Sequence, residues 1–287
     1  MTDNAPTTTA RRDSSERRGA MAGRRRGGPC IIAHRAGAAL WPENSLAGVR
    51  GSQALSVDGI EIDVHLTADG DLAVIHDSDL ARTTRGSGAV ASLTMAEIRR
   101  APLRQAAGSQ AADACVPSLA DVLAVMADGA SDLWLEMKGP TEGTAYPGMA
   151  HRVCAALAAA DFVGRTVVMS FDWDQLVDVR SLQPGQPGQP GLRTAALLDT
   201  GGLQRAGGVT PAVVRAKDTG ATWLAVAQGC ATPVLLRAAA AADLAVAVWT
   251  VNDEPALKRW LHSPVGAVIS DQPDRALALG RPARPWR

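Results

Sequence analysis

Two histidines and three acidic residues recur beside short apolar runs in the first half of the chain. His34 and His76 each follow such a run, and Glu61, Asp63 and Glu136 lie within two others. A reaction that takes a proton from one oxygen and gives one to another can use a pair of imidazoles. Carboxylates without a Cys or His triad form an oxygen-rich site that suits Ca²⁺ or Mg²⁺ rather than zinc. The pattern therefore predicts acid–base chemistry beside a divalent metal.

Two cations accompany these groups. Arg35 and Lys138 would place fixed positive charge where a phosphate could bind, and a metal beside them would offset the charge that develops on phosphoryl oxygens. Glu61 and Asp63 are two residues apart, so on a strand their side chains share one face. The alternative interpretation is that the acids are solvated rim charges or ion-pair partners of Arg35 and Lys138.

The elements that would position these residues follow a βα repeat. Short β-branched or apolar runs alternate with Ala- and Leu-rich helical stretches, which predicts an α/β fold with a parallel sheet. Eight units over about 250 residues are typical of a (β/α)₈ TIM barrel, whose functional residues lie at the C-terminal ends of the strands. The expected strands are Cys30–His34, Gly59–Leu66, Leu133–Met137, Thr166–Ser170, Arg193–Leu198, Trp223–Val226, Ala245–Trp249 and Ala267–Ser270.

A small insertion is expected between strand 2 and strand 3 of this barrel. The turn Thr67–Gly70 followed by the extended Leu72–Ile75 predicts a hairpin that returns His76 to the strand end. The remaining interval, Asp77–Val116, contains its own short helix, because Thr94 and Glu97 form a capping-box pattern.

Local signals also predict where helices begin and where loops lie. Ser118, Thr210-Pro211 and Thr232-Pro233 are expected to open helices. The glycine-rich segment Asp199–Gly208 is expected to be an irregular loop or a mobile lid. The repeated Pro-Gly-Gln of Gln183–Gly191 predicts a turn-rich spacer on the face opposite the site.

Composition divides the chain into two parts. Residues 1–28 carry seven Arg against three acids, whereas the 29 basic and 29 acidic residues of the whole chain cancel, so the rest has four more acids than bases. We predict a disordered basic tail at 1–28 and one barrel domain at 29–287. An acidic domain does not favour nucleic acid as a partner.

The same composition gives an expectation for the cellular location. The tail lacks the apolar core of a secretory signal, and no stretch of eighteen apolar residues follows. The four widely spaced cysteines form no CxxC pair, so reduced thiols are expected. These features favour a cytoplasmic protein without an integral membrane segment, and they leave its oligomeric state open.

Several motifs together resemble the glycerophosphodiester phosphodiesterase family in order and spacing, over residues 30–280. They are Ala33-His34-Arg35, Pro42-Glu43-Asn44-Ser45, Glu61-Ile62-Asp63-Val64, Leu66-Thr67-Ala68-Asp69-Gly70, His76-Asp77, Leu80-Ala81-Arg82-Thr83-Thr84-Arg85-Gly86, Val116-Pro117-Ser118-Leu119, Leu135-Glu136-Met137-Lys138, Ser170-Phe171-Asp172, Val248-Trp249-Thr250-Val251-Asn252 and Ile269-Ser270-Asp271-Gln272-Pro273.

The resemblance implies a barrel enzyme of lipid and glycerol metabolism that cleaves glycerophosphodiesters, as small-molecule substrates, to sn-glycerol 3-phosphate and an alcohol with Ca²⁺ or Mg²⁺. It implies that a glycerol hydroxyl attacks phosphorus and that water then opens the cyclic phosphate. The implied roles are acid and base for His34 and His76, metal ligands for Glu61, Asp63 and Glu136, phosphate contacts for Arg35 and Lys138, and a metal or glycerol contact for Glu43.

The chain departs from the family pattern in its first loop. Ala36 stands where the family usually has glycine, and Gly37 follows it, so the turn after strand 1 is expected to be reshaped. Trp41 in the same loop could stack on an alcohol group or simply pack. Trp249 is expected to line the pocket, and Asn252 to cap the following helix. His65 is expected to contact the residues that form the site rather than to bind the metal itself.

Two other functions stay open at this level. One is a phosphodiesterase of phospholipase-D type that acts on lysophospholipids or another glycerol-containing diester. The other is a catalytically idle barrel that only binds phosphate esters, a reading suggested by Ala36.

Overall fold

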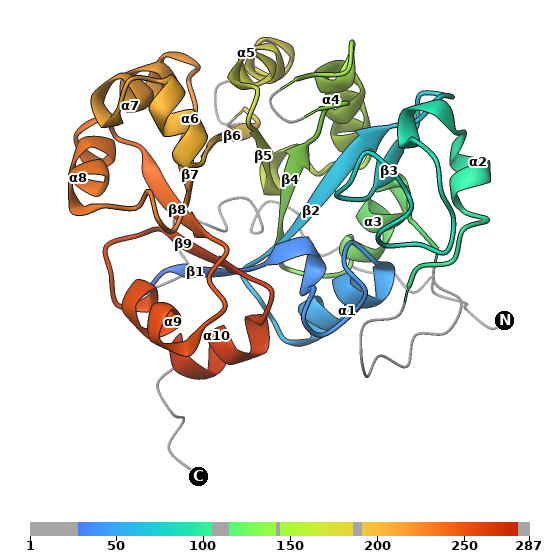
Figure 1. The fold of residues 1–287 in the computed structure, drawn as a ribbon, viewed down its shortest axis with the longest axis horizontal. Coiled ribbons are helices and arrows are strands. Elements are labelled where there is room, and N and C mark those ends of the chain that lie inside the picture. Colours follow the sequence, from blue (N-terminus) through green and yellow to red (C-terminus); the bar gives the residue numbers. More distant parts are fainter. Residues whose placement is uncertain (1–27, 105–114, 142–143, 186–190, 281–287) are drawn as a thin grey trace, which may run out of the picture.

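Eight parallel strands close into a barrel in the computed structural model, which describes residues 28–104, 115–141, 144–185 and 191–280 (Figure 1). The hydrogen-bonded order is β1-β9-β8-β7-β6-β5-β4-β2, and a β1–β2 pairing closes the ring. A ninth strand, β3, is antiparallel to β2. The bounds are β1 Cys30–Ala33, β2 Gly59–Leu66, β3 Leu72–Val74, β4 Asp132–Met137, β5 Thr166–Ser170, β6 Arg193–Leu198, β7 Trp223–Ala227, β8 Ala245–Trp249 and β9 Ala267–Ser270. The predicted barrel is confirmed.

The helices surround the strands, as Figure 1 shows. They are α1 Leu46–Ala54, α2 Met95–Ile98, α3 Leu119–Met126, α4 Met149–Ala159, α5 Trp173–Leu182, α6 Thr200–Arg205, α7 Val209–Asp218, α8 Pro233–Ala241, α9 Glu254–Leu261 and α10 Pro273–Gly280. Short 3₁₀ turns cover His34–Ala36, Val90–Ser92 and Val163–Arg165. Among the described residues, no helix is long and apolar enough to span a bilayer.

The barrel interior is filled by large side chains, Trp134 among them, and by several alanines. Trp134 of β4 is fully buried and belongs to an inner cluster that includes Ala195, Ala225, Ala247 and Ala267. The alanines leave the volume that the indole occupies, so the barrel is packed and forms no channel. Glu61 of β2 pairs in register with Trp134, and Asp63 and Glu136 pair two residues further toward the C-terminal ends of the strands.

Three of the predicted helix caps form as expected. Thr94 and Ser118 each make a reciprocal capping box with the acid three residues later, and Thr232 accepts a hydrogen bond from the Leu235 amide. The cap predicted at Thr210 is wrong, because α7 begins at Val209 after Gly208. Pro211 still fits the helix, since the first-turn amides need no partner within the helix.

The segment Asp199–Gly208 is also not the predicted irregular loop. It forms α6, whose N-cap Asp199 accepts a hydrogen bond from the Gly202 amide at 2.6 Å. The middle of the Gln183–Gly191 spacer, residues 186–190, lies outside the described residues, as does nearly all of the predicted 1–28 tail.

The predicted insertion is present between β2 and β4 and has its own small core. Leu80, Val90, Met95 and Ile98 are buried there together with Ile75, which directly precedes His76. In Figure 1 the insertion lies at one side of the barrel, around β3 and α2. This core fixes the backbone that carries His76 and the residues after it.

Candidate active site

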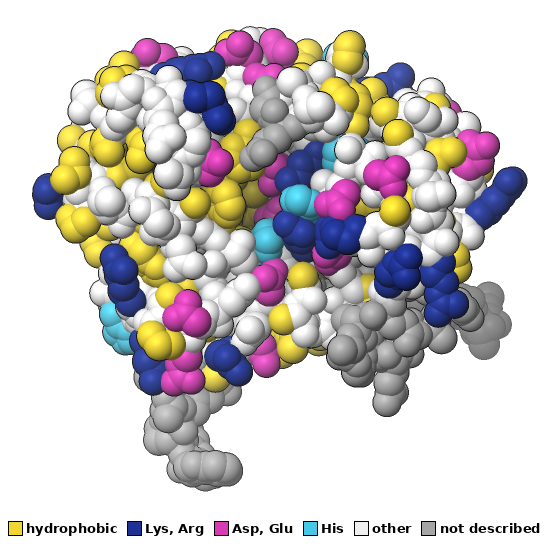
Figure 2. Space-filling model, viewed as in Figure 1, with side chains coloured by type: hydrophobic (Ala, Val, Ile, Leu, Met, Phe, Trp, Pro, Cys, Tyr) yellow, Lys and Arg dark blue, Asp and Glu magenta, His cyan; other side chains and the backbone are white. Residues whose placement is uncertain are grey.

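A pocket of about 330 Å³ opens at the C-terminal end of the barrel. Figure 2 shows histidine, acidic and basic side chains gathered around the hollow in the centre of this face. The pocket is lined by His34, Arg35, Glu61, His65, His76, Ser78, Glu136, Met137, Lys138, Gly139, Pro140, Thr141, Thr144, Met169, Ser170, Phe171, Asp172, Leu197, Trp249, Thr250 and Ile269. The residues proposed from the sequence for acid–base and phosphate contacts are all among them.

Three buried carboxylates meet beside this pocket, and two of them, Glu61 and Glu136, line it. Glu61 and Asp63 project from the same face of β2, and Glu136 lies opposite Asp63 on β4. One oxygen from each of the three lies within 4.8 Å of the others, and none of these side chains is more than a tenth exposed. Burial, and then repulsion from Asp63 and Glu136, raises the pKa of Glu61 well above its usual value. Burial likewise raises the pKa of Glu136 to about 7.

Two cations neutralise only part of this charge. Lys138 Nζ lies 2.6 Å from Glu136 Oε1 and 3.1 Å from Asp63 Oδ1. Burial alone would lower the pKa of Lys138, but the two carboxylates raise it, so the ammonium stays charged. Arg35 directs its backbone N–H to Glu61 Oε2 at 2.7 Å, and its Nε lies 3.8 Å from Asp63 Oδ2. The ion pairs of the alternative interpretation thus exist, yet three carboxylates face two cations.

This imbalance suits a divalent cation. A cluster of carboxylate oxygens, without sulfur or imidazole, is the donor set that Ca²⁺ and Mg²⁺ prefer. The residues present therefore fit such a metal, with Glu61, Asp63 and Glu136 as the groups that could hold it. A bound cation would relieve the mutual repulsion that raises the pKa of Glu61.

His34, directly after β1, is oriented by a carboxylate from the other end of the chain. Its Nδ1 lies 2.6 Å from Asp271 Oδ1, and its Nε2 lies 3.9 Å from Glu61 Oε2. Because an ionised carboxylate only accepts hydrogen bonds, Nδ1 carries the proton and Nε2 is left to face the pocket. Burial alone would raise the pKa of Asp271, but the hydrogen bond with His34 and the other polar contacts outweigh burial, so the pKa is lowered.

Asn252 holds that orienting carboxylate in place. Its Nδ2 donates to Asp271 Oδ2 at 2.6 Å, and its Oδ1 accepts the Asp271 amide at 3.0 Å. The predicted capping role of Asn252 is therefore wrong, and Asp253 caps α9 instead. In the sequence, Asp271 stands out only as a member of the Ile269–Pro273 motif. No local pattern reveals its partnership with His34, which is 237 positions away.

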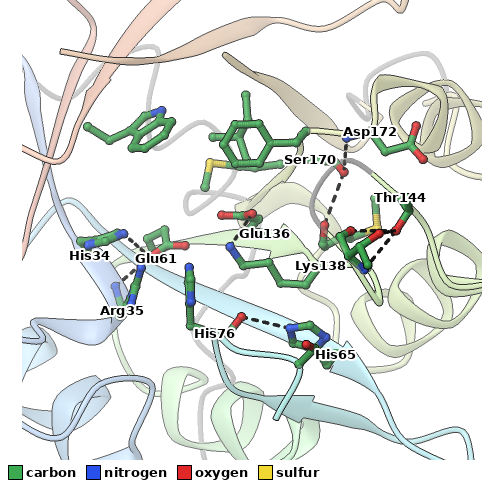
Figure 3. Close-up of a pocket in the computed structure, with 18 of the residues that line it drawn as sticks. His34, Arg35, Glu61, His65, His76, Glu136, Lys138, Thr144, Ser170 and Asp172 are labelled. Atoms are coloured by element: carbon green, nitrogen blue, oxygen red, sulfur yellow. Dashed lines mark hydrogen bonds and ion pairs between the residues drawn. The ribbon is translucent and has the colours of Figure 1, made fainter. Parts of the chain in front are cut away.

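His76, just beyond β3, has the same arrangement with its neighbour. Its Nδ1 lies 2.7 Å from Asp77 Oδ1, so the ring proton is again on Nδ1 and Nε2 carries none. Burial lowers the pKa of His76. In Figure 3, His34 and His76 reach the same space beside Glu61, Glu136 and Lys138 from separate elements. The structure thus brings the two imidazoles and the acids to one pocket.

His65 supports His76 through the backbone. Its Nε2 donates to the His76 carbonyl at 3.0 Å, and its Nδ1 accepts the Tyr146 hydroxyl at 2.9 Å. Both ring nitrogens are thereby used, and the side chain is almost fully buried. The geometry agrees with the expectation that His65 is not a ligand.

The opposite wall of the pocket is apolar. Phe171 and Trp249 meet edge to face with their ring centroids 5.8 Å apart, beside Met169, Leu197 and Ile269. Trp249 lines the pocket as predicted. Trp41, in contrast, is not among the lining residues. Its ring lies so close to Gly51 of α1 that a Cβ there would meet it at 2.2 Å.

The loop after β1 is bent by three successive residues with positive φ. Arg35, Ala36 and Gly37 have φ of 47°, 60° and 87°. Ala36 is fully buried and takes a conformation that costs a residue with a side chain about 1–2 kcal/mol. The bend places the Arg35 amide against Glu61, and the reshaping of the turn by Ala36 stays a prediction.

Asn44 and Glu43, later in this loop, lie behind the pocket. The Asn44 amide donates to Asp63 Oδ2 at 2.9 Å, and its oxygen accepts the Asp63 N–H at 3.2 Å. The role of Asn44 in fixing a carboxylate was not foreseen, although the Pro42–Ser45 motif contains it. Glu43 does not line the pocket. Its carboxylate contacts Arg35 Nη1 at 3.2 Å and is also bound by Arg82.

Comparison with known proteins assigns the chain to a family. The model described as "Glycerophosphoryl diester phosphodiesterase family" matches residues 34–275. A glycerophosphodiester phosphodiesterase of Caldanaerobacter subterraneus subsp. tengcongensis is 29% identical over 251 residues, which are 88% of this chain and 97% of that protein.

Solved structures show the same fold. A protein from Agrobacterium tumefaciens, assigned as a glycerophosphoryl diester phosphodiesterase, superposes with a TM-score of 0.79 at 24% identity, covering 88% of this chain and 98% of that one. A phosphodiesterase from Oleispira antarctica, solved with its product sn-glycerol-3-phosphate, superposes with a TM-score of 0.70 at 23% identity, covering 88% and 96%.

Proposed function

Because the chain belongs to the glycerophosphoryl diester phosphodiesterase family, we propose that it hydrolyses glycerophosphodiesters to sn-glycerol 3-phosphate and an alcohol, with a divalent metal and two catalytic histidines. Proteins of this family are phosphoric diester hydrolases, and this chain is an enzyme of that class. The idle phosphate-binding barrel is therefore set aside. One observation carries the proposal: His34 and His76 line one pocket with Glu61 and Glu136, and Asp63 lies against these two carboxylates.

The phosphate group would bind beside the cations. Arg35 and Lys138 both line the pocket next to the carboxylates. Their positive charge would hold the phosphoryl oxygens and offset the charge that grows on them during reaction. A cation held by Glu61, Asp63 and Glu136 would supply further electrostatic stabilisation of these oxygens, and Ca²⁺ or Mg²⁺ fits the oxygen donors.

The histidines would exchange protons with the reacting oxygens through Nε2. In the first step one imidazole takes the proton of the attacking glycerol hydroxyl, and the other gives a proton to the departing alcohol oxygen. In the second step the roles reverse, as water opens the cyclic phosphate. Asp271 and Asp77 hold the Nδ1 atoms, so each ring keeps its orientation while its charge changes.

The test is a panel of glycerophosphodiesters assayed for glycerol 3-phosphate release with Ca²⁺, with Mg²⁺ and with a chelator. The wild-type protein should turn over at least one diester, and the chelator should abolish turnover. His34→Ala and His76→Ala should each remove activity without changing the unfolding midpoint. His151→Ala is the matched control, because His151 is exposed on α4 away from the pocket. Near wild-type rates in either variant at the site would contradict the acid–base roles.

The apolar wall favours one alternative substrate class. Phe171, Trp249 and their neighbours offer a surface that an acyl chain could cover, as expected for a phosphodiesterase of phospholipase-D type that acts on lysophospholipids. Lysophosphatidylcholine added to the same panel distinguishes the two: choline release from it at a higher kcat/KM than from glycerophosphocholine would favour the alternative.

A further inference from the structure

Arg82, in the insertion between β2 and β4, connects the two halves of the site without lining the pocket. It lies in the turn after Leu80, whose side chain is buried in the core of the insertion. The Thr84 hydroxyl closes this turn on the Leu80 carbonyl at 2.8 Å. The backbone at Arg82 is therefore held, and its side chain extends toward the barrel.

The guanidinium of Arg82 makes two bidentate contacts. Nη1 and Nη2 donate to the two oxygens of Glu43 at 2.8 and 2.7 Å. Nε and Nη2 donate to the two oxygens of Asp77 at 2.5 and 2.9 Å. Only the planar fork of an arginine can bind two carboxylates in this way, because a lysine offers a single point charge.

Each of these carboxylates also binds a group of the site. Asp77 Oδ1 is the partner of His76 Nδ1, and Glu43 Oε1 is the partner of Arg35 Nη1. Arg82 thus fixes the distance between the anchor of one imidazole and the anchor of the guanidinium that faces the phosphate. No other described residue contacts both Asp77 and Glu43 through hydrogen bonds.

Stability alone does not account for the position of this arrangement beside the site. The Arg82 side chain is 47% exposed, whereas Glu43 and Asp77 are 17% and 29% exposed, so solvent screens these pairs only in part. The same insertion contains a simpler pair, Arg99 with Asp121, at 44% and 38% exposure, which contacts nothing in the pocket. The two arginines differ in what their partners touch.

We propose that Arg82 is a positioning residue for the reaction: it fixes Asp77, and through it the His76 imidazole, relative to Arg35. The proposal rests on the proposed function of the site. It assigns a role to the insertion, which would carry an arginine to the rim of the pocket in addition to extending the barrel.

The experiment compares Arg82→Ala, Arg82→Lys and the control Arg99→Ala. A displaced imidazole costs about 10- to 100-fold in rate. We expect Arg82→Ala to lose about that factor in kcat with KM within threefold, and Arg82→Lys to resemble Arg82→Ala. Arg99→Ala should keep the wild-type kcat. The urea midpoints of all the variants are measured at the assay pH, so that a loss of kcat is separated from a loss of stability.

Three results would overturn the proposal: a kcat of Arg82→Ala within twofold of wild type, an effect confined to KM, or a loss of kcat that excess Ca²⁺ or Mg²⁺ restores. Restoration of kcat by excess metal would show that Arg82→Ala weakens metal binding rather than displacing the imidazole. Wild-type protein is measured in parallel, so a failure of the proposed function is recognised separately. If the wild type cleaves no diester, the proposed function is wrong, and the proposed role of Arg82 is wrong with it.

Discussion

Replacing Asp271 by asparagine removes one charge and keeps nearly the same shape. In the wild type, Asp271 Oδ1 accepts from His34 Nδ1 at 2.6 Å, while Oδ2 accepts from Asn252 Nδ2 at 2.6 Å. An asparagine has only one oxygen for these two donors. If its oxygen faces His34, its amide NH₂ opposes the NH₂ of Asn252. If it is flipped, its NH₂ donates to His34 Nδ1 and moves the ring proton to Nε2, which is the wrong tautomer for a base.

The size of the effect follows from the contact that is lost. A hydrogen bond to a charged group contributes about 1.5–3 kcal/mol, and it matters most when the His34 ring becomes positive during reaction. Since 1.36 kcal/mol corresponds to a tenfold change in rate, kcat should fall about 10- to 150-fold. KM should change little, because Asp271 is not among the residues that line the pocket.

The assay is steady-state release of glycerol 3-phosphate from glycerophosphocholine at saturating metal. Asp253→Asn is the matched control: Asp253 follows Asn252 in the loop after β8 and caps α9 by accepting the Ala256 amide, a role that asparagine performs about as well. A kcat of Asp271→Asn within twofold of wild type would refute the reasoning, as would an equal loss in Asp253→Asn.

Three further predictions concern stability and metal binding. The hydrogen bond from Arg82 is the main cause that lowers the pKa of Asp77 to about 2. Its stabilising contribution is thus present above about pH 4 and lost as the pH falls toward 2, so the urea midpoints of wild type and Asp77→Asn should converge over that range; a constant difference would argue against it. Gly37→Ala should cost about 1–2 kcal/mol in unfolding free energy, because Gly37 has φ of 87° and a Cβ there would lie 2.9 Å from the Trp41 ring; an unchanged melting temperature would contradict this. Ca²⁺ or Mg²⁺ at about 100 times its Kd should stabilise the wild type by about 2.7 kcal/mol, and Glu61→Gln should need a higher concentration for the same shift in melting temperature; identical titration curves would remove Glu61 from the metal site.

The strands and the clustering of the acids could be predicted because each depends on short-range pattern. A buried strand must be apolar on both faces, so Glu61 and Asp63 stand out within an otherwise apolar run, and their shared face follows from the period of two. The barrel then brings Glu136 beside them, since adjacent parallel strands end at the same rim.

The predictions for the starts of α6 and α7 were wrong because neighbouring residues gave conflicting signals for where each helix begins. Thr210-Pro211 is a good helix start by itself, but Gly207 and Gly208 adopt positive φ and let α7 begin earlier. The glycines of α6 suggested a loop, yet the cap at Asp199 is enough to start a helix there. In both cases the first residue of the helix depends on small differences in free energy between neighbouring start positions.

The supporting contacts of the site could not be read from the sequence. The partners of His34, Asp63 and Glu43 come from segments that are 237, 19 and 39 positions away, and only the folded barrel brings them together. Asn252 shows the difficulty most clearly. A polar residue just before a helix is a plausible cap, but its amide binds Asp271 from the next strand.

The most direct test of the central claim is a crystal structure of the protein with sn-glycerol 3-phosphate and Ca²⁺. We expect the ion to be bound by carboxylate oxygens of Glu61, Asp63 and Glu136, and the phosphorus to lie between the Nε2 atoms of His34 and His76. An ion held elsewhere, or a phosphate that contacts neither imidazole, would contradict the account.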